Sequence, residues 1–453
     1  MLLQKPAFLL FYHTRAAEAS FGEWLGVLWH GLSLDCTVAG YVTAFPVVVV
    51  LASFWIPLSQ RVWRIILTVY FSLIALVTAA IFAVDLTLYG YWGFRLDGSV
   101  LIYLADPGEA LASASWGEVL RQIIIMLVYA GAMIWSYRRI LRLFRVEPVS
   151  LRGRIVPTVA ALLIGGLTFL AIRGGVTVAT ANVSKVYFSS NMFLNHAATN
   201  PVFSFLSSVG DNENYAEAYP FFEVERRKTL FEELRGNRPG ADAGTPRLLR
   251  SDRPNVVLIL LESFGRTIMD ETVNGEPVMP NMQRFKREGV WFENFFANSF
   301  RTDRGQVAVL CGFPAQTTMS IMKLPRKSAT LPSLARSLGR EGYRSVFMYG
   351  GDLNFTNQAS FMYSTGWEEL IWQKDMQLDA PTSKWGYADD VVVDLFGDEV
   401  EALGRAEQPF LAGLLTLSSH EPFEVPFAKF DDKLLSAMSF SDAQIGRVSV
   451  RLP

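Results

Sequence analysis

Long apolar runs with few charges fill the first 180 residues and constrain the fold of this 453-residue chain more than any other feature. We place four membrane spans in them, at about residues 37–57, 62–89, 123–137 and 155–177. About 20 apolar residues cross the roughly 30 Å hydrocarbon core of a bilayer, so most of these runs suffice and the third is short. Hydrophobic residues make up 51% of the chain and charged residues 19%, which argues against a disordered chain and a wholly soluble enzyme.

Arginines between the spans predict how the chain crosses the membrane. Two follow the first span and six follow the third: Arg61, Arg64, Arg138, Arg139, Arg142, Arg145, Arg152 and Arg154. Basic loops stay in the cytoplasm, so both loops are expected there. The loop between spans two and three contains acidic residues instead and is expected outside: Asp97, Asp106, Glu109 and Glu118. The region after residue 177 is therefore predicted to lie on the external face.

The first 36 residues are expected outside by the same rule. Residues 6–12 resemble the end of a further helix that is too short to span, and we expect a fifth span to be clipped there. They are not a signal peptide, because they have neither a basic start nor a cleavage pattern. Residues 21–34 suit an interfacial amphipathic stretch.

We divide the chain into a transmembrane domain (1–179), a polar linker (180–253) and a partial catalytic domain (254–453). Two cysteines and four histidines exclude a disulfide framework and a His-rich metal site. A formal net charge of −2 gives no support for a nucleic-acid partner.

From residue 254 the pattern becomes that of an α/β domain. Residues 255–261 read as a buried central strand, and 292–296, 345–349 and 410–417 as further strands. Helices are expected at 279–288, from near 302, at 334–340 and at 389–403. This alternation predicts a mostly parallel sheet covered on both faces, with its site at the carboxyl ends of the strands.

Two segments near strand ends contain residues suited to phosphoryl chemistry. Glu262 ends the first strand, where a carboxylate either caps the next turn or binds a cation. Thr302 begins a helix, where its hydroxyl either caps that helix or acts as a nucleophile activated by a cation. Arg301 and Arg304 flank it and could neutralise phosphate charge.

Two further segments follow predicted strands. Asp352 and Asn357, in YGGDLNFTN, either form a plain turn or bind a hydroxyl or headgroup. His420, in LSSHEPF, is the single histidine of the α/β half and is either structural or catalytic. All four segments are expected at the same edge of the sheet.

These motifs, in the order NVVLILLESFG, NSFRTDRG, YGGDLNFTN and LSSHEPF, resemble the membrane-anchored phosphoglycerol transferases of the lipoteichoic acid synthase type, within the sulfatase and alkaline phosphatase superfamily. The resemblance extends from HGLSLDCTVAGY through NHAATNPVFS to SDAQIG. It implies a polytopic helical membrane domain followed by an alkaline-phosphatase/sulfatase-like α/β domain. It also implies a divalent cation, Mn²⁺ or Mg²⁺.

By this resemblance Glu262 and Thr302 bind the metal, and Thr302 becomes phosphoglycerylated. His420 would contact the substrate phosphate, and Asp352 and Asn357 would lie near the glycerol. The donor implied is phosphatidylglycerol, the acceptor an envelope glycan or glycolipid, and the location the bacterial cytoplasmic membrane, with the soluble domain facing the periplasm or cell exterior.

The sequence departs from that family in two places. Thr356 and Gln358 replace a Trp and an Arg of the glycerol site, and no Asp-His dipeptide completes the metal site. We therefore expect the α/β domain to be incomplete through C-terminal truncation. Two alternatives stay open: a phosphoethanolamine transferase, and a non-enzymatic remnant without the metal site. A sulfatase is disfavoured because Cys311 lacks the required C/S-x-P-x-R context and reads as a core residue.

Overall fold

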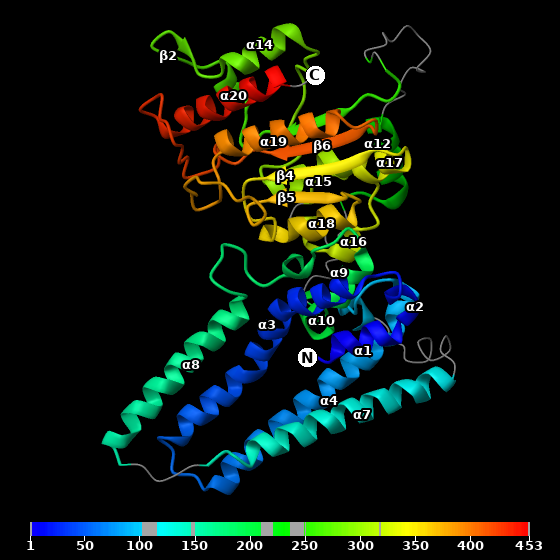
Figure 1. Cartoon of the computed structure of the whole chain (residues 1–453), viewed down its shortest axis with the longest axis vertical. Helices are drawn as coiled ribbons and strands as arrows, with labels where there is room; N and C mark the ends of the chain where they lie inside the picture. The colour runs from blue at the N-terminus through cyan, green and yellow to red at the C-terminus, as the bar shows by residue number, and fades with distance from the viewer. Residues whose placement is uncertain are drawn as a thin grey trace.

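The computed structural model describes residues 2–101, 116–145, 150–209, 221–235, 249, 251–316 and 319–451. In it, four long helices extend away from an α/β domain (Figure 1). Asp106, Glu109 and residues 210–220, 236–248 and 250 of the expected linker lie outside the described residues.

The four long helices are apolar and long enough to span a membrane. They are α3 (Phe21–Ser53), α4 (Gln60–Trp92), α7 (Trp116–Leu141) and α8 (Ile155–Arg173). Helix α3 begins 16 residues before the expected first span and absorbs the stretch read as interfacial. It starts at a capping box, because the Ser20 side chain accepts from the Glu23 N–H and the Glu23 carboxylate accepts from the Ser20 N–H at 2.7 Å.

Short elements pack at the end of the long helices that lies nearest the α/β domain. They are α1 (Gln4–Phe11), α2 (His13–Ala16), η1 (Gly98–Leu101), η3 (Val183–Val186), α9 (Met192–Ala198) and α10 (Pro201–Ser208); η2 (Arg152–Arg154) precedes α8, and α12 (Val224–Arg235) follows α10 in the chain. Phe8 of α1 is fully buried against Leu34, Phe82 and Leu194. Residues 183–208, expected to belong to a polar linker, are thus packed elements.

The α/β domain contains a four-stranded parallel sheet in the order β1-β6-β4-β5. Its strands are β1 (Val256–Leu260), β4 (Arg344–Tyr349), β5 (Glu369–Trp372) and β6 (Phe410–Leu415); β2 (Thr272–Val273) and β3 (Glu276–Pro277) form a separate antiparallel pair. Its helices are α13 (Arg266–Met269), α14 (Pro280–Glu288), α15 (Thr302–Cys311), η4 (Ile321–Lys323), α16 (Pro325–Ser328), α17 (Leu334–Arg340), η5 (Phe355–Asn357), α18 (Gln358–Ser364), α19 (Asp389–Gly404) and α20 (Lys433–Arg451).

Helices cover both faces of this sheet, as the sequence predicted. Phe347 and Tyr349 of β4 face a core that includes α15, α17 and α18, whereas Val346 and Met348 face α19 and α20. Figure 1 shows α19 and α18 on opposite sides of the strands. Gly413 of β6 allows this packing, because a Cβ there would lie 2.6 Å from the Phe347 ring.

Two predicted strands differ from the structure. Residues 255–261 were expected to form a central strand, but β1 lies at the edge and is half-buried, whereas the fully buried β6 is internal. Both runs are continuously apolar, so the sequence pattern does not tell which of the two strands lies inside the sheet. Residues 292–296 form no strand; Phe292 and Phe296 are 70% and 82% exposed. Aromatic side chains favour strands only where a neighbouring strand packs against them.

Candidate functional site

The carboxyl ends of three neighbouring strands meet at one edge of the sheet. Leu260 of β1 is in register with Leu415 of β6, which is in register with Tyr349 of β4. The segments that follow these strands contain Glu262, His420 and Asp352. The edge predicted from the sequence is therefore the edge at which the structure places them.

Glu262 and Thr302 contact each other at this edge. Thr302 is the first residue of α15, and its hydroxyl donates to Glu262 Oε2 at 2.8 Å. The Ser263 hydroxyl donates to the other carboxylate oxygen, Oε1, at 3.1 Å. Both Glu262 and Thr302 are half-buried. A hydroxyl that begins a helix and a carboxylate that ends a strand are thus brought together across 40 residues of chain.

The loop after β6 fixes the backbone of Glu262. The Glu262 N–H donates to Thr416 Oγ1 at 2.8 Å, and the Ser419 hydroxyl donates to the Glu262 carbonyl at 2.6 Å. Ser263 has a φ of 59°, a left-handed conformation that costs a non-glycine residue about 1–3 kcal/mol. Because Ser419 precedes His420, these contacts bring the histidine's segment against the glutamate.

Arg301 and Arg304 add positive charge beside the N-terminus of α15. Arg301 Nε lies 3.5 Å from Asp303 Oδ1, and Arg301 also lines a cavity of about 740 Å³. The Arg304 guanidinium lies 5.8 Å from the centre of the Phe300 ring. The helix N-terminus has a positive dipole end and unpaired N–H groups, so the surroundings of Thr302 favour an anion.

The remaining predicted residues lie on the neighbouring loops. Asp352 Oδ1 accepts from the Asn354 N–H at 2.9 Å, and the Asn357 amide donates to the Lys323 carbonyl at 3.3 Å. His420 Nδ1 lies 2.8 Å from the Glu421 carbonyl oxygen. In the described part of the chain, no hydrogen bond joins Asp352, Asn357 or His420 to the Glu262–Thr302 pair.

Asp389 is a buried residue behind the candidate site that the sequence reading missed. Its carboxylate is buried and accepts from the Leu417 and Ser418 N–H groups at 2.7 and 3.2 Å, and from the Ser441 hydroxyl at 2.7 Å. It thereby orders the loop that leads to His420. Burial raises the pKa of Asp389, although these hydrogen bonds oppose the shift. Acidic residues are common in the first turn of a helix, where they interact with the helix dipole, so the residue type alone does not indicate this role.

Trp385 is a second residue that the sequence reading missed. Its ring centre lies 4.5 Å from that of His420 and 5.6 Å from that of Phe355. Its Nε1–H donates to the Glu421 carbonyl at 2.8 Å. It lies in a loop without periodic pattern, so only the tertiary structure shows that it packs beside the histidine.

The oxygen atoms of Glu262 and Thr302 suit a cation. Magnesium is commonly held by one or two carboxylates, with water and substrate phosphate completing its coordination, and hard oxygen donors also suit manganese. The carboxylate oxygens of Glu262 and the hydroxyl oxygen of Thr302 are donors of the kind that such a cation prefers. Among residues that the structure describes, no group of three or more His, Cys, Asp or Glu side chains gathers as a metal cluster. Cys311 is buried, and burial raises the pKa of its thiol to about 11.

Part of the chain is similar to known proteins. Residues 254–449 match the sulfatase family model. Phosphoglycerol transferase I of Xanthomonas campestris is 34% identical over 225 residues, covering 44% of this chain and 31% of that protein. Lipoteichoic acid synthase 1 of Bacillus subtilis is 30% identical over 191 residues, covering 38% of this chain and 27% of that protein. These matches span less than a third of either relative.

A solved structure also matches this part of the chain. A protein in the alkaline phosphatase superfamily from Vibrio parahaemolyticus is 28% identical, with a TM-score of 0.42. The match covers 45% of this chain and 51% of that protein.

Proposed function

We propose that the protein is a membrane-anchored phosphoglycerol transferase whose catalytic domain contains residues 254–449, the part that matches the sulfatase family model. The observation that supports this most directly is the 2.8 Å contact between Thr302 Oγ1 and Glu262 Oε2 at the carboxyl edge of a parallel sheet. The donor is phosphatidylglycerol and the acceptor a hydroxyl of an envelope glycan or glycolipid. The relatives named for phosphoglycerol transfer support this choice of group.

In this proposal Thr302 Oγ1 attacks the phosphorus of the lipid headgroup. Its proton leaves along the hydrogen bond to Glu262 Oε2. The bond between phosphorus and the diacylglycerol oxygen breaks, and that oxygen takes up a proton from water. The acceptor hydroxyl then attacks the phosphothreonine and gives its proton to the hydroxide left by that water. The bond between phosphorus and Thr302 Oγ1 breaks, and Oγ1 takes its proton back from Glu262, which restores both residues.

Glu262 and Thr302 would hold a divalent cation, Mn²⁺ or Mg²⁺. When bound, such a cation supplies positive charge that stabilises phosphoryl oxygens and lowers the pKa of a nearby hydroxyl. Arg301 and Arg304, with the N-terminus of α15, would bind the phosphate oxygens. His420 would contact the same phosphate, and Asp352 and Asn357 the glycerol hydroxyls.

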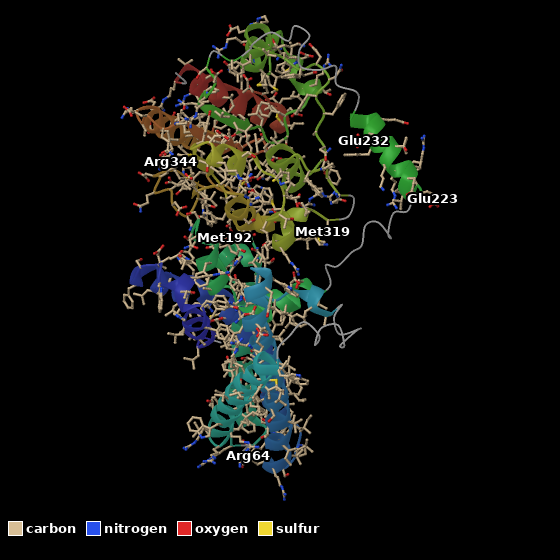
Figure 2. All side chains as sticks on the ribbon, turned by 90° about the vertical axis from the view of Figure 1, so that its right-hand side faces the viewer. Arg64, Met192, Glu223, Glu232, Met319 and Arg344 are labelled. Carbon is tan, nitrogen blue, oxygen red and sulfur yellow. The ribbon has the colours of Figure 1, made fainter. Side chains whose placement is uncertain are left out.

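We also propose that the α/β domain faces the periplasm or cell exterior from the bacterial cytoplasmic membrane. The basic residues between the long helices support this orientation. Figure 2 shows Arg64 at the end of the helices far from Arg344 of the α/β domain. A membrane anchor keeps the lipid donor and the diacylglycerol product within reach of the domain.

The test is turnover of headgroup-labelled phosphatidylglycerol by the full chain in vesicles with Mg²⁺ or Mn²⁺. Replacing Thr302 by alanine removes the nucleophile, and we expect a loss on the order of 10³-fold or more. Thr330→Ala, an exposed threonine after α16, is the matched control and should keep full turnover.

Three outcomes would overturn parts of this proposal. Near-normal turnover by Thr302→Ala would remove Thr302 as nucleophile. Turnover of phosphatidylethanolamine alone would establish the alternative headgroup. No turnover of either lipid by the unaltered chain, with a folded protein, would favour the non-enzymatic alternative.

A further inference from the structure

A cavity of about 740 Å³ lies between the short elements above the long helices and the α/β domain. Both parts contribute walls: Phe94, His196 and Phe203 from the first part, Lys323 and Asn357 from the second. Arg301, the neighbour of Thr302, also lines it. The cavity therefore reaches the residue that directly precedes the candidate nucleophile.

Positive charge dominates the lining. Its charged residues are Arg95, Arg301, Lys323, Arg326, Lys327 and Asp97. Arg326 pairs with Asp97 at 3.1 Å, and Arg95 pairs with Asp85 at 2.9 Å. Lys323 and Lys327 are exposed and form no ion pair within the described residues. The surplus of cations favours an anionic ligand.

Three lining residues contain polar atoms that are buried without a hydrogen-bond partner in the described structure. They are Arg95 Nε, His196 Nε2 and Asn357 Oδ1, from residues that are 5%, 6% and 9% exposed. A buried polar atom left unpaired costs about 1–3 kcal/mol. A polar ligand in the cavity would offset this cost, whereas an apolar one would not.

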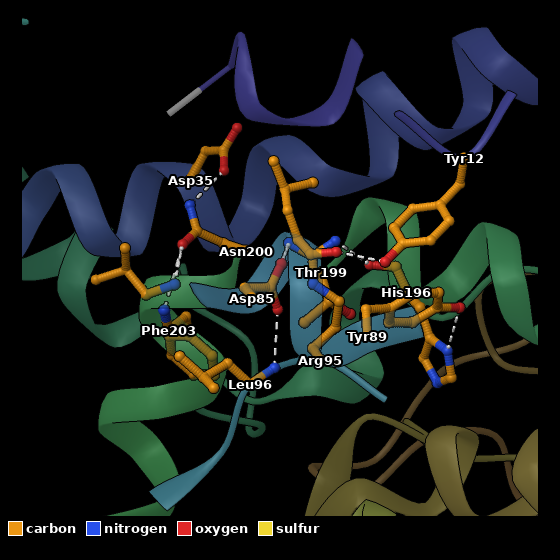
Figure 3. Close-up of polar contacts among 12 residues, drawn as sticks. Tyr12, Asp35, Asp85, Tyr89, Arg95, Leu96, His196, Thr199, Asn200 and Phe203 are labelled. Atoms are coloured by element: carbon orange, nitrogen blue, oxygen red, sulfur yellow. Dashed lines mark hydrogen bonds and ion pairs between the residues drawn. The ribbon is translucent and has the colours of Figure 1, made fainter. Parts of the chain in front are cut away.

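His196 is held in one orientation, as Figure 3 shows. Its Nδ1 lies 3.1 Å from the Tyr89 hydroxyl, and Arg95 donates to its backbone carbonyl at 3.3 Å. Burial, with the nearby charge of Arg95, lowers the pKa of His196 to about 3, so the ring is neutral. When the Tyr89 hydroxyl donates to Nδ1, Nε2 has the ring proton and is a hydrogen-bond donor.

The cavity lies at the level where the long helices end. Helix α4 ends at Trp92, and Phe94 and Arg95 come after its C-cap residue Gly93. Phe203 belongs to α10, which packs against α4 and α3. Figure 1 shows α9, α10 and α16 in this middle layer of the molecule. A lipid headgroup lies at this depth when its acyl chains lie beside the membrane-spanning part of the helices.

We propose that this cavity is where the phosphorylated headgroup of an anionic glycerophospholipid first binds, before its phosphate reaches Thr302, with Lys323, Lys327 and His196 as ligands of the headgroup at this first position. This inference rests on the proposed function, because it places the donor lipid beside Arg301 and hence beside Thr302. The apolar lining at Phe94 and Phe203 accommodates the glycerol backbone and the first acyl carbons.

The experiment measures equilibrium binding of dioctanoyl phosphatidylglycerol to the detergent-solubilised full chain with Thr302→Ala, so that no turnover occurs. Lys323→Gln with Lys327→Gln removes two exposed charges without disturbing the core, and we expect binding to weaken about tenfold or more. His196→Phe removes both ring nitrogens and should also weaken binding. Lys433→Gln, an exposed lysine at the start of α20, is the matched control.

The result that overturns the inference is equal affinity of the double-lysine variant and the Lys433→Gln control. Equal binding of glycerol phosphate without acyl chains would assign the cavity to a free phosphate and reject the lipid. Transfer assays separate this inference from the proposed function. Lipid binding through the two lysines without transfer by the unaltered chain rejects the function alone, and full transfer by the double-lysine variant rejects the cavity alone.

Discussion

At the scale of single residues, Asp389 determines the loop that contains His420. Its Oδ1 accepts from the Leu417 N–H, and its Oδ2 accepts from the Ser418 N–H and the Ser441 hydroxyl. In Asp389→Asn an amide would face the Ser418 N–H, so one buried donor loses its acceptor. We expect a loss of about 1–3 kcal/mol in the free energy of unfolding. Thermal unfolding of the full chain in detergent measures it.

The loss of stability caused by Asp389→Asn should become smaller as the pH rises. Burial raises the pKa of Asp389 above 3.8, so its contribution to stability is full below that value and is lost as the pH rises through the folded-state pKa. Asparagine does not titrate, so the deficit of Asp389→Asn should be smaller at about pH 7 than at about pH 4. Asp394→Asn, an exposed partner of Arg447, is the control and should change stability by under about 1 kcal/mol at both values. A deficit that grows with pH would contradict the assigned shift.

The residues that the sequence could identify are those next to a strong local pattern. Glu262 follows an apolar run and Thr302 begins a helix, and the structure joins them at 2.8 Å. Asp389 and Trp385 lack such a sign, since their importance comes from loops distant in sequence that fold against them. Their roles depend on tertiary contacts, which no local spacing encodes.

At the scale of elements, periodicity predicted whether a segment is a helix or a strand better than it predicted where that element lies in the fold. The helix at 334–340 and the strand at 345–349 agree closely with α17 and β4. The sequence reading missed α20 and β5, because a four-residue strand and a helix with many small polar residues give weak patterns. The sequence reading also did not predict the order of the strands in the sheet, because β1 and β6 are both continuously apolar.

The contact between α14 and α20 gives a prediction at this scale. A Cβ at Gly446 of α20 would lie 2.4 Å from the Asn281 side chain. That side chain is held because its amide donates to Asp442 Oδ2 at 3.0 Å. Gly446→Ala should therefore destabilise the protein by about 1–3 kcal/mol through overpacking. Thermal unfolding measures the change.

Gly404, at the end of α19, is the matched control, because a Cβ there would meet nothing within 4 Å. Gly404→Ala should be neutral or stabilise the protein by up to about 1 kcal/mol, since alanine favours the helix. Equal effects of the two substitutions would show that the α14–α20 contact is not tightly packed.

At the scale of the whole molecule, the distribution of charge predicts the direction in which the chain crosses the membrane. Arg61 and Arg64 lie in the first two turns of α4. Arg138 lies in the last turn of α7, and Arg142 follows that helix. These helix ends are the ones far from the α/β domain. Basic ends stay in the cytoplasm, so the α/β domain should be external.

Single cysteines test this orientation in a chain with Cys36→Ser and Cys311→Ala. A membrane-impermeant maleimide, applied to bacterial cells with a permeabilised outer envelope, should label Lys433→Cys in α20. It should label Arg142→Cys, just after α7, only once the cytoplasmic membrane is broken. Labelling of Arg142→Cys alone in intact cells would reverse the orientation. The candidate site would then face the cytoplasm, where an envelope glycan cannot reach it, and the proposed acceptor would have to be abandoned.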